Sequence, residues 1–294
     1  MSQFAHGIHA IDTTIENERV ELLGKCYPNL NAAQEAYQHQ FESIIWLTYR
    51  KDFPQMNPYE YTNDAGWGCM LRTTQMLLAH ALQRLVLGKS NWGIDWNVPL
   101  PIDLIEMLKW FVDSTSSECL YSIHHMVKVG IQYDKLPGEW FGPTTAAQVA
   151  RDLVNGQRGK TSRLSMYVPQ DGVIYSDQVM ELCTEVDEKT CSGDVGMEYS
   201  PTTGVMYDPL LNPRIEKRSK VDDKWTTAIL ILVPLRLGLD SVHESYIPAL
   251  QQVFTIPHCV GIVGGKRGHS VYFVGVQGNN IYANISLPQY VNVL

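Results

Sequence analysis

The sequence lacks the cysteine and histidine patterns that would indicate a metal centre. It has 294 residues and 6 cysteines, none of them paired as CxxC or placed at the ligand spacing of a zinc site. His124 and His125 are adjacent, so on a helix they would point about 100° apart and make a poor metal clamp. We therefore expect no metal and no cofactor, and we place these two histidines at the surface or at an interface.

A secretory signal and long apolar runs are missing as well. The first 21 residues carry Asp12, Glu16 and Glu18, where a signal peptide would need a basic start and an apolar core. The longest apolar run, Ala228–Leu235, is far too short to span a bilayer. We therefore interpret the chain as cytoplasmic and its cysteines as reduced thiols.

The charge balance argues against a general nucleic-acid surface. The net charge is −8, whereas such a surface needs a basic face. Hydrophobic residues make up 45% of the chain and charged residues 18%, which is typical of an ordinary globular protein. The length allows one or two domains with an ample core. We expect no nucleic-acid partner.

The most informative stretch runs from Asp64 to Gly88. It begins with Gly66 and Gly68 on either side of Trp67, where the chain can turn sharply because glycine tolerates positive φ. Neither proline nor glycine follows until Gly88, and leucines recur at helical spacing. This pattern predicts a long, mostly buried helix that begins at the residue after Gly68 and ends at Gly88.

Cys69 is that first helical residue, a position suited to a nucleophile. The unpaired N–H groups at a helix start and the helix macrodipole stabilise a thiolate. The same N–H groups can hold the oxyanion of a tetrahedral intermediate. We therefore predict that Cys69 is a nucleophile whose sulfur is exposed and faces a groove. The alternative is that Cys69 is a buried small hydrophobic residue.

Several motifs along the chain resemble those of one protease family. They are LLGKCY at 22–27, SIIWLTYRKDFP at 43–54, GWGCMLR with QMLLAHAL from 66, YSIHHMVKVG at 121–130, GEWFGPTTAAQVA at 138–150, ILILVPLRLGLD at 229–240 and GIVGGKRG at 261–268. Together they resemble the autophagins, which are autophagy-related cysteine proteases with a papain-like fold. The resemblance extends from about Leu22 to about Tyr282.

The resemblance implies an α+β fold and a substrate class. The fold would be a papain-like core, in which the central helix packs on an antiparallel sheet, with the C-terminal part of the family fold missing. Members of the family cleave a ubiquitin-like autophagy modifier after a C-terminal glycine and release it from phosphatidylethanolamine. The expected partners are thus the precursor and lipidated forms of this modifier, and membrane contact would come only through the lipidated form.

The resemblance also suggests a domain organisation. Residues 1–21 would be a loose tail and residues 22–294 the protease domain, with an auxiliary subdomain at about 97–189. Turn-rich and charged composition independently predicts a mobile insertion at about 190–224.

Local patterns predict the individual elements. The expected helices run from a cap at Asn31 to about Trp46, from Asp103 to about Asp113, from Ser122 to about Gly130, from Pro143 to Gly156, from Ser176 to about Val186 and from Ser241 to about Phe254. The expected strands are Leu164–Gln170, Ala228–Leu235, Val260–Val263 and a hairpin of Val271–Gln277 with Asn280–Ser286.

Three further residues match functional positions of the family. Tyr49 corresponds to a tyrosine that donates its hydroxyl to the oxyanion hole, although a packed aromatic residue is the alternative. Trp140, in GEWFGP, corresponds to a tryptophan over the slot for the substrate glycine, and Gly142 belongs to the same slot. For Trp140 the alternative is simple core filling.

Two catalytic positions of the family are substituted. The family aspartate that orients the base falls on Asn284, and the family histidine that is the base falls on Ser286. Neither side chain present here can do this chemistry at neutral pH. His269 precedes the first hairpin strand, in a segment that gates the cleft in the family, but nothing in the sequence orients it. Because triad members act as a unit, we predict a weak or inactive protease.

The residues after Tyr282 resemble nothing in the family. We expect a truncated or alternatively spliced product, or a gene model that continues into non-coding sequence, rather than an evolved pseudoenzyme. A second functional interpretation is a non-catalytic binder of the modifier. A third is a poorly folded product with an exposed sheet edge.

Overall fold

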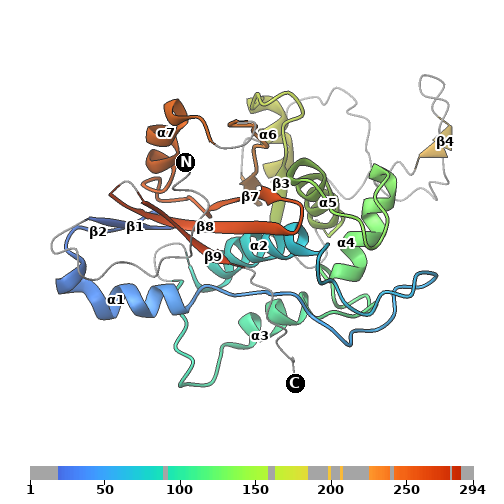
Figure 1. Cartoon of the computed structure of the whole chain (residues 1–294), viewed down its shortest axis with the longest axis horizontal. Coiled ribbons are helices and arrows are strands. Elements are labelled where there is room, and N and C mark those ends of the chain that lie inside the picture. The colour runs from blue at the N-terminus through green and yellow to red at the C-terminus, as the bar shows by residue number, and fades with distance from the viewer. Residues whose placement is uncertain are drawn as a thin grey trace. The chain divides into compact units, whose positions relative to one another are not determined.

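The computed structural model describes residues 19–88, 92–157, 163–184, 198–199, 206–207, 225–238, 242–278 and 280–285 (Figure 1). The chain divides into two compact units: Met1–Ala150 with Pro234–Leu294, and Arg151–Val233. The second unit begins later along the chain than the auxiliary subdomain expected at about 97–189. Of the expected tail, residues 1–18 lie outside the described residues, whereas Val20 already belongs to a strand.

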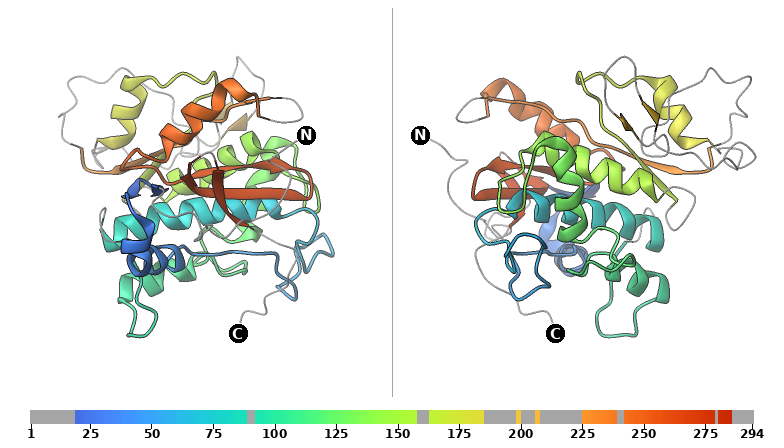
Figure 2. Two further views of the ribbon diagram at one scale, coloured as in Figure 1. Left: turned by 60° about the vertical axis from the view of Figure 1, so that its left-hand side comes forward. Right: turned by 90° about the vertical axis from the view of Figure 1, so that its right-hand side faces the viewer.

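The first unit is organised around helix α2, Cys69–Leu87. The helix begins at Cys69 and is followed by Gly88 at φ 103°, a conformation that favours glycine, so both predicted limits are confirmed. Most of its residues are buried, including polar ones such as Thr73 and Gln83. It packs on strands β7 and β8 and on helices α3 and α4, which Figures 1 and 2 show around it.

The sheet against α2 is antiparallel and contains five strands in the order β2-β1-β8-β7, with β9 also paired to β8. Its strands are β1 (Val20–Leu22), β2 (Lys25–Tyr27), β7 (Ile262–Lys266), β8 (His269–Gln277) and β9 (Asn280–Ile285). The hairpin of β8 and β9 is confirmed, because Gln277 lies opposite Asn280 across the turn. One irregularity in its register falls between Phe273 and Gly275.

Further helices and short 3₁₀ turns make up the rest of the described first unit. They are α1 (Leu30–Glu42), α3 (Ile102–Lys109), α4 (Ile123–Gly130), the start of α5 (Pro143–Gly156), α7 (Ile247–Val253) and the 3₁₀ turns η1 (Ile131–Tyr133) and η3 (Glu244–Tyr246). The start of α4 is as predicted, since the Ser122 side chain accepts from the His125 N–H at 3.2 Å.

The predicted limits of α1 are wrong at both ends. Asn29, not Asn31, is the N-cap, because its backbone is extended and its Oδ1 accepts from the Ala32 N–H at 3.2 Å. The helix ends at Glu42 rather than near Trp46, since the Ser43 hydroxyl donates to the His39 carbonyl at 2.6 Å and also reaches Ile94. Likewise, α3 ends at Lys109 instead of about Asp113.

The second unit contains a two-stranded parallel sheet of β3 (Leu164–Tyr167) and β6 (Ala228–Ile231), together with helix α6 (Ser176–Cys183). Tyr167, Val179 and Cys183 form its buried cluster. The expected mobile insertion lies largely outside the described residues, apart from the pair β4 (Glu198–Tyr199) and β5 (Met206–Tyr207). Among the described residues, no helix is long and apolar enough to cross a membrane.

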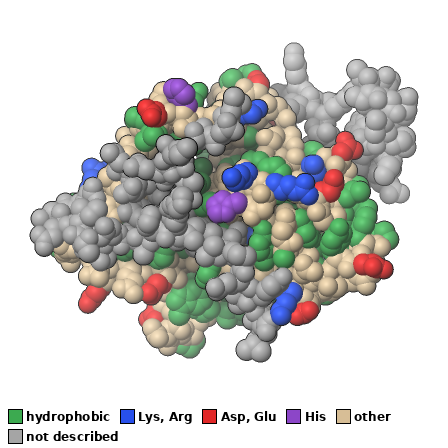
Figure 3. Space-filling model, viewed as in Figure 1, with side chains coloured by type: hydrophobic (Ala, Val, Ile, Leu, Met, Phe, Trp, Pro, Cys, Tyr) green, Lys and Arg blue, Asp and Glu red, His purple; other side chains and the backbone are tan. Residues whose placement is uncertain are grey.

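On the face drawn in Figure 3, basic and acidic side chains are interspersed with apolar and neutral polar ones. Two exposed tryptophans, Trp46 and Trp96, lie apart from the buried core, and the Trp96 indole donates to the Glu42 carbonyl at 3.2 Å. Exposed apolar side chains of this kind are normal on globular proteins.

Candidate functional site

The sulfur of Cys69 lies at the first turn of α2, as predicted, but it is not exposed. Cys69 is only 1% accessible, so the prediction of an exposed thiol is wrong for this structure. The Ser270 hydroxyl on β8 donates to the Cys69 Sγ at 3.2 Å, across the interface between the helix and the sheet. A serine hydroxyl is therefore a direct hydrogen-bond partner of the Cys69 sulfur.

The turn that leads into α2 is closed by hydrogen bonds to a single carbonyl. The Asp64 carbonyl accepts from the Trp67 N–H at 3.2 Å and from the Gly68 N–H at 2.8 Å. Gly66 sits at φ 84°, so a side chain there would be strained. The Trp67 indole donates to the Asn63 carbonyl at 3.1 Å, which fixes the ring beside the turn.

Tyr49 lies near the Cys69 thiol. Its ring is buried, and its hydroxyl has no hydrogen-bond partner of good geometry among the described residues. Burial is the main cause that raises the pKa of Tyr49 above its ordinary value, and the Cys69 thiol and then Asp64 raise it further. The Gly66 N–H acts in the opposite direction. The hydroxyl is thus protonated at neutral pH and has a hydrogen to donate.

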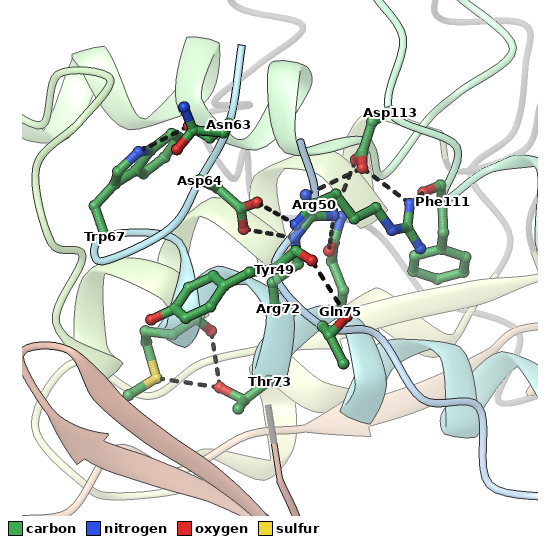
Figure 4. A network of polar contacts seen from close by, with 12 residues as sticks. Tyr49, Arg50, Asn63, Asp64, Trp67, Arg72, Thr73, Gln75, Phe111 and Asp113 are labelled. Carbon is green, nitrogen blue, oxygen red and sulfur yellow. Dashed lines mark hydrogen bonds and ion pairs between the residues drawn. The ribbon is translucent and has the colours of Figure 1, made fainter. Parts of the chain in front are cut away.

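A buried network of four charged side chains lies behind the turn (Figure 4). Arg72 donates from Nε to Asp64 Oδ2 at 2.8 Å and from Nη1 and Nη2 to the two oxygens of Asp113 at 2.9 and 3.0 Å. Arg50 donates from Nη1 to Asp113 Oδ2 at 2.9 Å. The Arg72 and Asp64 side chains are completely buried, and that of Asp113 is 6% accessible.

The network is electrically balanced, with two cations against two anions. Burial alone would raise the pKa of Asp113, but Arg72 and Arg50 outweigh it and lower that pKa. Burial likewise opposes the charge on Arg72, yet Asp113 and Asp64 raise its pKa. For Arg50 burial dominates, and its pKa is lowered.

Trp140 and Gly142 lie beside each other. A Cβ built on Gly142 would be 3.8 Å from the Trp140 ring, an ordinary contact distance. The Trp140 indole nitrogen is buried and has no partner among the described residues. The Trp140 segment also packs close to the turn before α2. Gly138 lies so near Tyr61 that a Cβ built on it would be 2.1 Å from the Tyr61 hydroxyl. The Tyr61 ring in turn meets the Trp67 ring edge-on.

Of the two positions predicted to replace the family aspartate and histidine, only Asn284, in β9, is among the described residues. The backbone of Asn284 pairs with that of Tyr272, and Ser286 lies outside the described residues. His269 is exposed at the start of β8, opposite Lys266 in the ladder. Among the residues that the structure describes, the sulfur of Cys69 has no contact from an imidazole.

The prediction that His124 is a surface residue is wrong. Its ring is 6% accessible, hydrogen-bonds through Nε2 to the Pro54 carbonyl at 2.6 Å and meets Phe53 edge-on. His125 interacts through Nδ1 with the Cys119 carbonyl at 2.8 Å. In the described part of the chain, no group of three or more His, Cys, Asp or Glu residues is arranged to hold a metal ion.

The sequence matches the model of the peptidase C54 catalytic domain over residues 34–283. The chain belongs to the peptidase C54 family. The resemblance to the autophagins is thereby confirmed, and the mixed helix and sheet structure agrees with an α+β C54 domain.

Curated relatives of this C54 chain are cysteine proteases. Cysteine protease ATG4A of Xenopus laevis is 32% identical over 265 residues, which cover 90% of this chain and 62% of the relative. Cysteine protease ATG4B of Gallus gallus is 33% identical over 267 residues, with coverages of 90% and 64%. Cysteine protease ATG4B of Oryza sativa subsp. japonica is 34% identical over 268 residues, with coverages of 88% and 52%. The chain therefore spans less than two thirds of the length of these relatives.

Sequence reasoning missed the residues that reach Cys69 and Arg72 from a distance along the chain. Ser270 is separated from Cys69 by 201 residues, and Asp113 from Arg72 by 41. No local pattern indicates such contacts. The available signal was a charged residue, Arg72, within a helix predicted to be mostly buried, since a buried arginine requires an anion nearby.

Proposed function

We propose that this chain is a cysteine peptidase of autophagy that binds the C-terminal segment of a ubiquitin-like modifier and is weakly active or inactive as a protease. Cys69 is the proposed nucleophile, the Tyr49 hydroxyl and the N–H groups at the start of α2 are the proposed oxyanion donors, and Trp140 with Gly142 forms the proposed glycine slot. Family membership, cysteine protease relatives and the position of Cys69 support this proposal.

The single observation behind the weak activity is the contact between Ser270 and Cys69, with a donor–acceptor distance of 3.2 Å. Cleavage needs a base to take the thiol proton and an acid to protonate the leaving amine. A serine hydroxyl does neither at neutral pH. Since Asn284 and Ser286 align with the family aspartate that orients the base and the histidine that is the base, we propose that the chain supplies binding and oxyanion groups without proton transfer.

The finer parts of the proposal follow the family. They are a papain-like arrangement of α2 on the sheet, a cytoplasmic location, and both precursor and phosphatidylethanolamine-linked modifier as ligands. The antiparallel sheet packed on the nucleophile helix supports the first of these. Contact with a membrane would then come only through the lipidated ligand.

Cleavage of a modifier precursor by the purified chain tests the catalytic part of the proposal. We expect the cleavage rates of the unaltered chain and of Cys69→Ala to agree within about tenfold. The double variant Asn284→Asp with Ser286→His should cleave faster than both. Turnover by the unaltered chain that Cys69→Ala abolishes would contradict weak activity.

A second candidate function is sequestration of the modifier without chemistry, which the burial of the Cys69 sulfur favours. A pull-down with the modifier, combined with a modifier that carries a thiol-reactive C-terminus, separates the two functions. Binding without labelling of Cys69 supports sequestration, and labelling of Cys69 supports the peptidase. Absence of binding would contradict both.

A further inference from the structure

Asp64 contacts both chain segments that bring groups to the candidate site. Its carboxylate Oδ1 accepts from the Arg50 N–H at 2.7 Å, and its own N–H donates to the Arg50 carbonyl at 3.2 Å. These two bonds hold the backbone immediately after Tyr49. Its carbonyl accepts from the Gly68 N–H, immediately before Cys69. One residue therefore ties the hydroxyl-bearing segment to the thiol-bearing one.

The Asp64 side chain lies very close to Gly68, immediately before the start of α2. A Cβ built on Gly68 would lie 2.3 Å from Asp64 Oδ2 and 2.6 Å from the Asp64 Cβ, so no side chain fits there. The backbone of Gly68 itself has φ −78°, which any residue can adopt. Glycine at this position is thus required by the approach of Asp64 and not by the backbone conformation.

The electrostatics of the helix start also depend on Asp64. Helix α2 has no acidic residue in its first turn and no side-chain cap, whereas it places Arg72 near its positive end. A cation there is unfavourable, since the helix macrodipole is already positive at this end. The Asp64 carboxylate, 2.8 Å from the Arg72 Nε, compensates both charges from outside the helix.

A gain in folding stability does not explain why this network of buried charges is present. Replacing buried ion pairs with well-packed apolar residues is often neutral or stabilising, because desolvation offsets most of the attraction between the charges. What the charges do provide here is geometry: each hydrogen bond of Asp64 fixes a segment that borders the Cys69 sulfur or the Tyr49 ring.

We propose that Asp64 is a positioning residue that sets the Tyr49 hydroxyl against the Cys69 sulfur and keeps the start of α2 closed over that sulfur. Its carboxylate acts through the Arg50 N–H and the Arg72 guanidinium, and its side chain packs against Gly68. The proposal rests on the roles proposed above for Cys69 and Tyr49. Its test measures how readily a reagent reaches the Cys69 thiol and does not measure cleavage. Either experiment can therefore fail while the other gives its expected result.

The test compares Asp64→Asn with Asp113→Asn by alkylation with iodoacetamide and peptide mass spectrometry. Both variants remove one buried anion from the same network, but Asp113 bonds only to the side chains of Arg50 and Arg72 and not, as Asp64 does, to the Arg50 backbone N–H. Cys259 is a second buried thiol in the same unit and reports any general loosening. The measured quantity is the rate for Cys69 divided by the rate for Cys259.

In Asp64→Asn the amide group must turn a donor toward Arg72 or toward the Arg50 N–H, so a bond to a buried charged group or to the backbone is lost. We expect this loss to open the helix start and to raise the alkylation ratio about tenfold or more, whereas Asp113→Asn changes it less than about threefold. Equal changes in the two variants, or no change in Asp64→Asn, would overturn the proposal.

Gly68→Ala is the second variant, for the case in which Asp64→Asn does not fold. It keeps all four charges and displaces the helix start from Asp64 through the added methyl group. We expect the ratio of Cys69 to Cys259 alkylation to rise here too. An unchanged ratio in folded Gly68→Ala would overturn the positioning role.

Discussion

The two ends of helix α2 are held in different ways. At the N-terminal end, Arg72 is matched by the carboxylates of Asp64 and Asp113. At the C-terminal end, the buried Arg84 donates to backbone carbonyls, those of Leu23 at 3.3 Å, Cys259 at 2.9 Å and Pro257 at 2.6 Å. The bonds of Arg72 thus join charge to charge, whereas these three bonds of Arg84 join a charge to backbone carbonyls.

This difference indicates what each end does. Charged pairs in a fully buried setting tolerate little displacement, which suits the end that borders Cys69 and Tyr49. Bonds to carbonyls instead attach α2 to the turn after β1 and to the loop before β7, and so hold the helix on its sheet. Between the two ends, His80 is fully buried beside Trp92, with ring centroids 4.5 Å apart.

Removing the arginine of the N-terminal end should have the largest effect. Arg72→Met leaves the buried Asp64 carboxylate without its cation and Asp113 with Arg50 alone, and we expect the free energy of unfolding to fall by about 3–5 kcal/mol. Urea unfolding followed by tryptophan fluorescence measures this loss. Lys109→Ala, which removes an exposed ion pair with Glu106, is the control and should leave the midpoint unchanged. A similar small effect of both changes would contradict the account.

Removing the arginine of the C-terminal end should cost less. Arg84→Met leaves buried carbonyl groups without their donor, so we expect a loss of about 2 kcal/mol in the same urea experiment. If Arg84→Met proved more destabilising than Arg72→Met, the distinction between the two ends would be wrong.

The middle of the helix should respond to pH. Burial, and then the charge of Arg84, lowers the pKa of His80 to about 3. Because the unfolded chain binds a proton near pH 6.5, His80 contributes no pH dependence above that value and destabilises the fold increasingly as the pH falls toward 3. We expect a loss of about 1 kcal/mol per pH unit below pH 6 that is absent in His80→Phe. Urea midpoints at pH 5 and pH 7 measure it, and identical differences in the two proteins would contradict the assignment.

Features with a local cause were predictable from the sequence. The helix limits at Cys69 and Gly88, the Ser122 cap and the hairpin turn after Gln277 each follow from a few neighbouring residues. The cap of α1 was misplaced because Asn29 and Asn31 are both acceptable by type, and only the backbone conformation chooses between them.

The candidate site was predictable only where a motif marks it. Cys69 lies where the GWGC motif indicates, and Tyr49 is buried beside it. The closure of the site was not predictable, because it depends on Ser270 from a distant strand. Burial of the thiol is a property of tertiary packing and not of the helix that carries it.

The most direct test of the account is the order in which two thiols react with iodoacetamide in the folded, unaltered chain at neutral pH. Cys26 is exposed, although partial burial and then Glu21 raise its pKa, whereas Cys69 is 1% accessible and covered by the contact with Ser270. We predict that Cys26 is alkylated at least about tenfold faster than Cys69. Faster alkylation of Cys69 would show an open, activated thiol and would contradict the closed site described above.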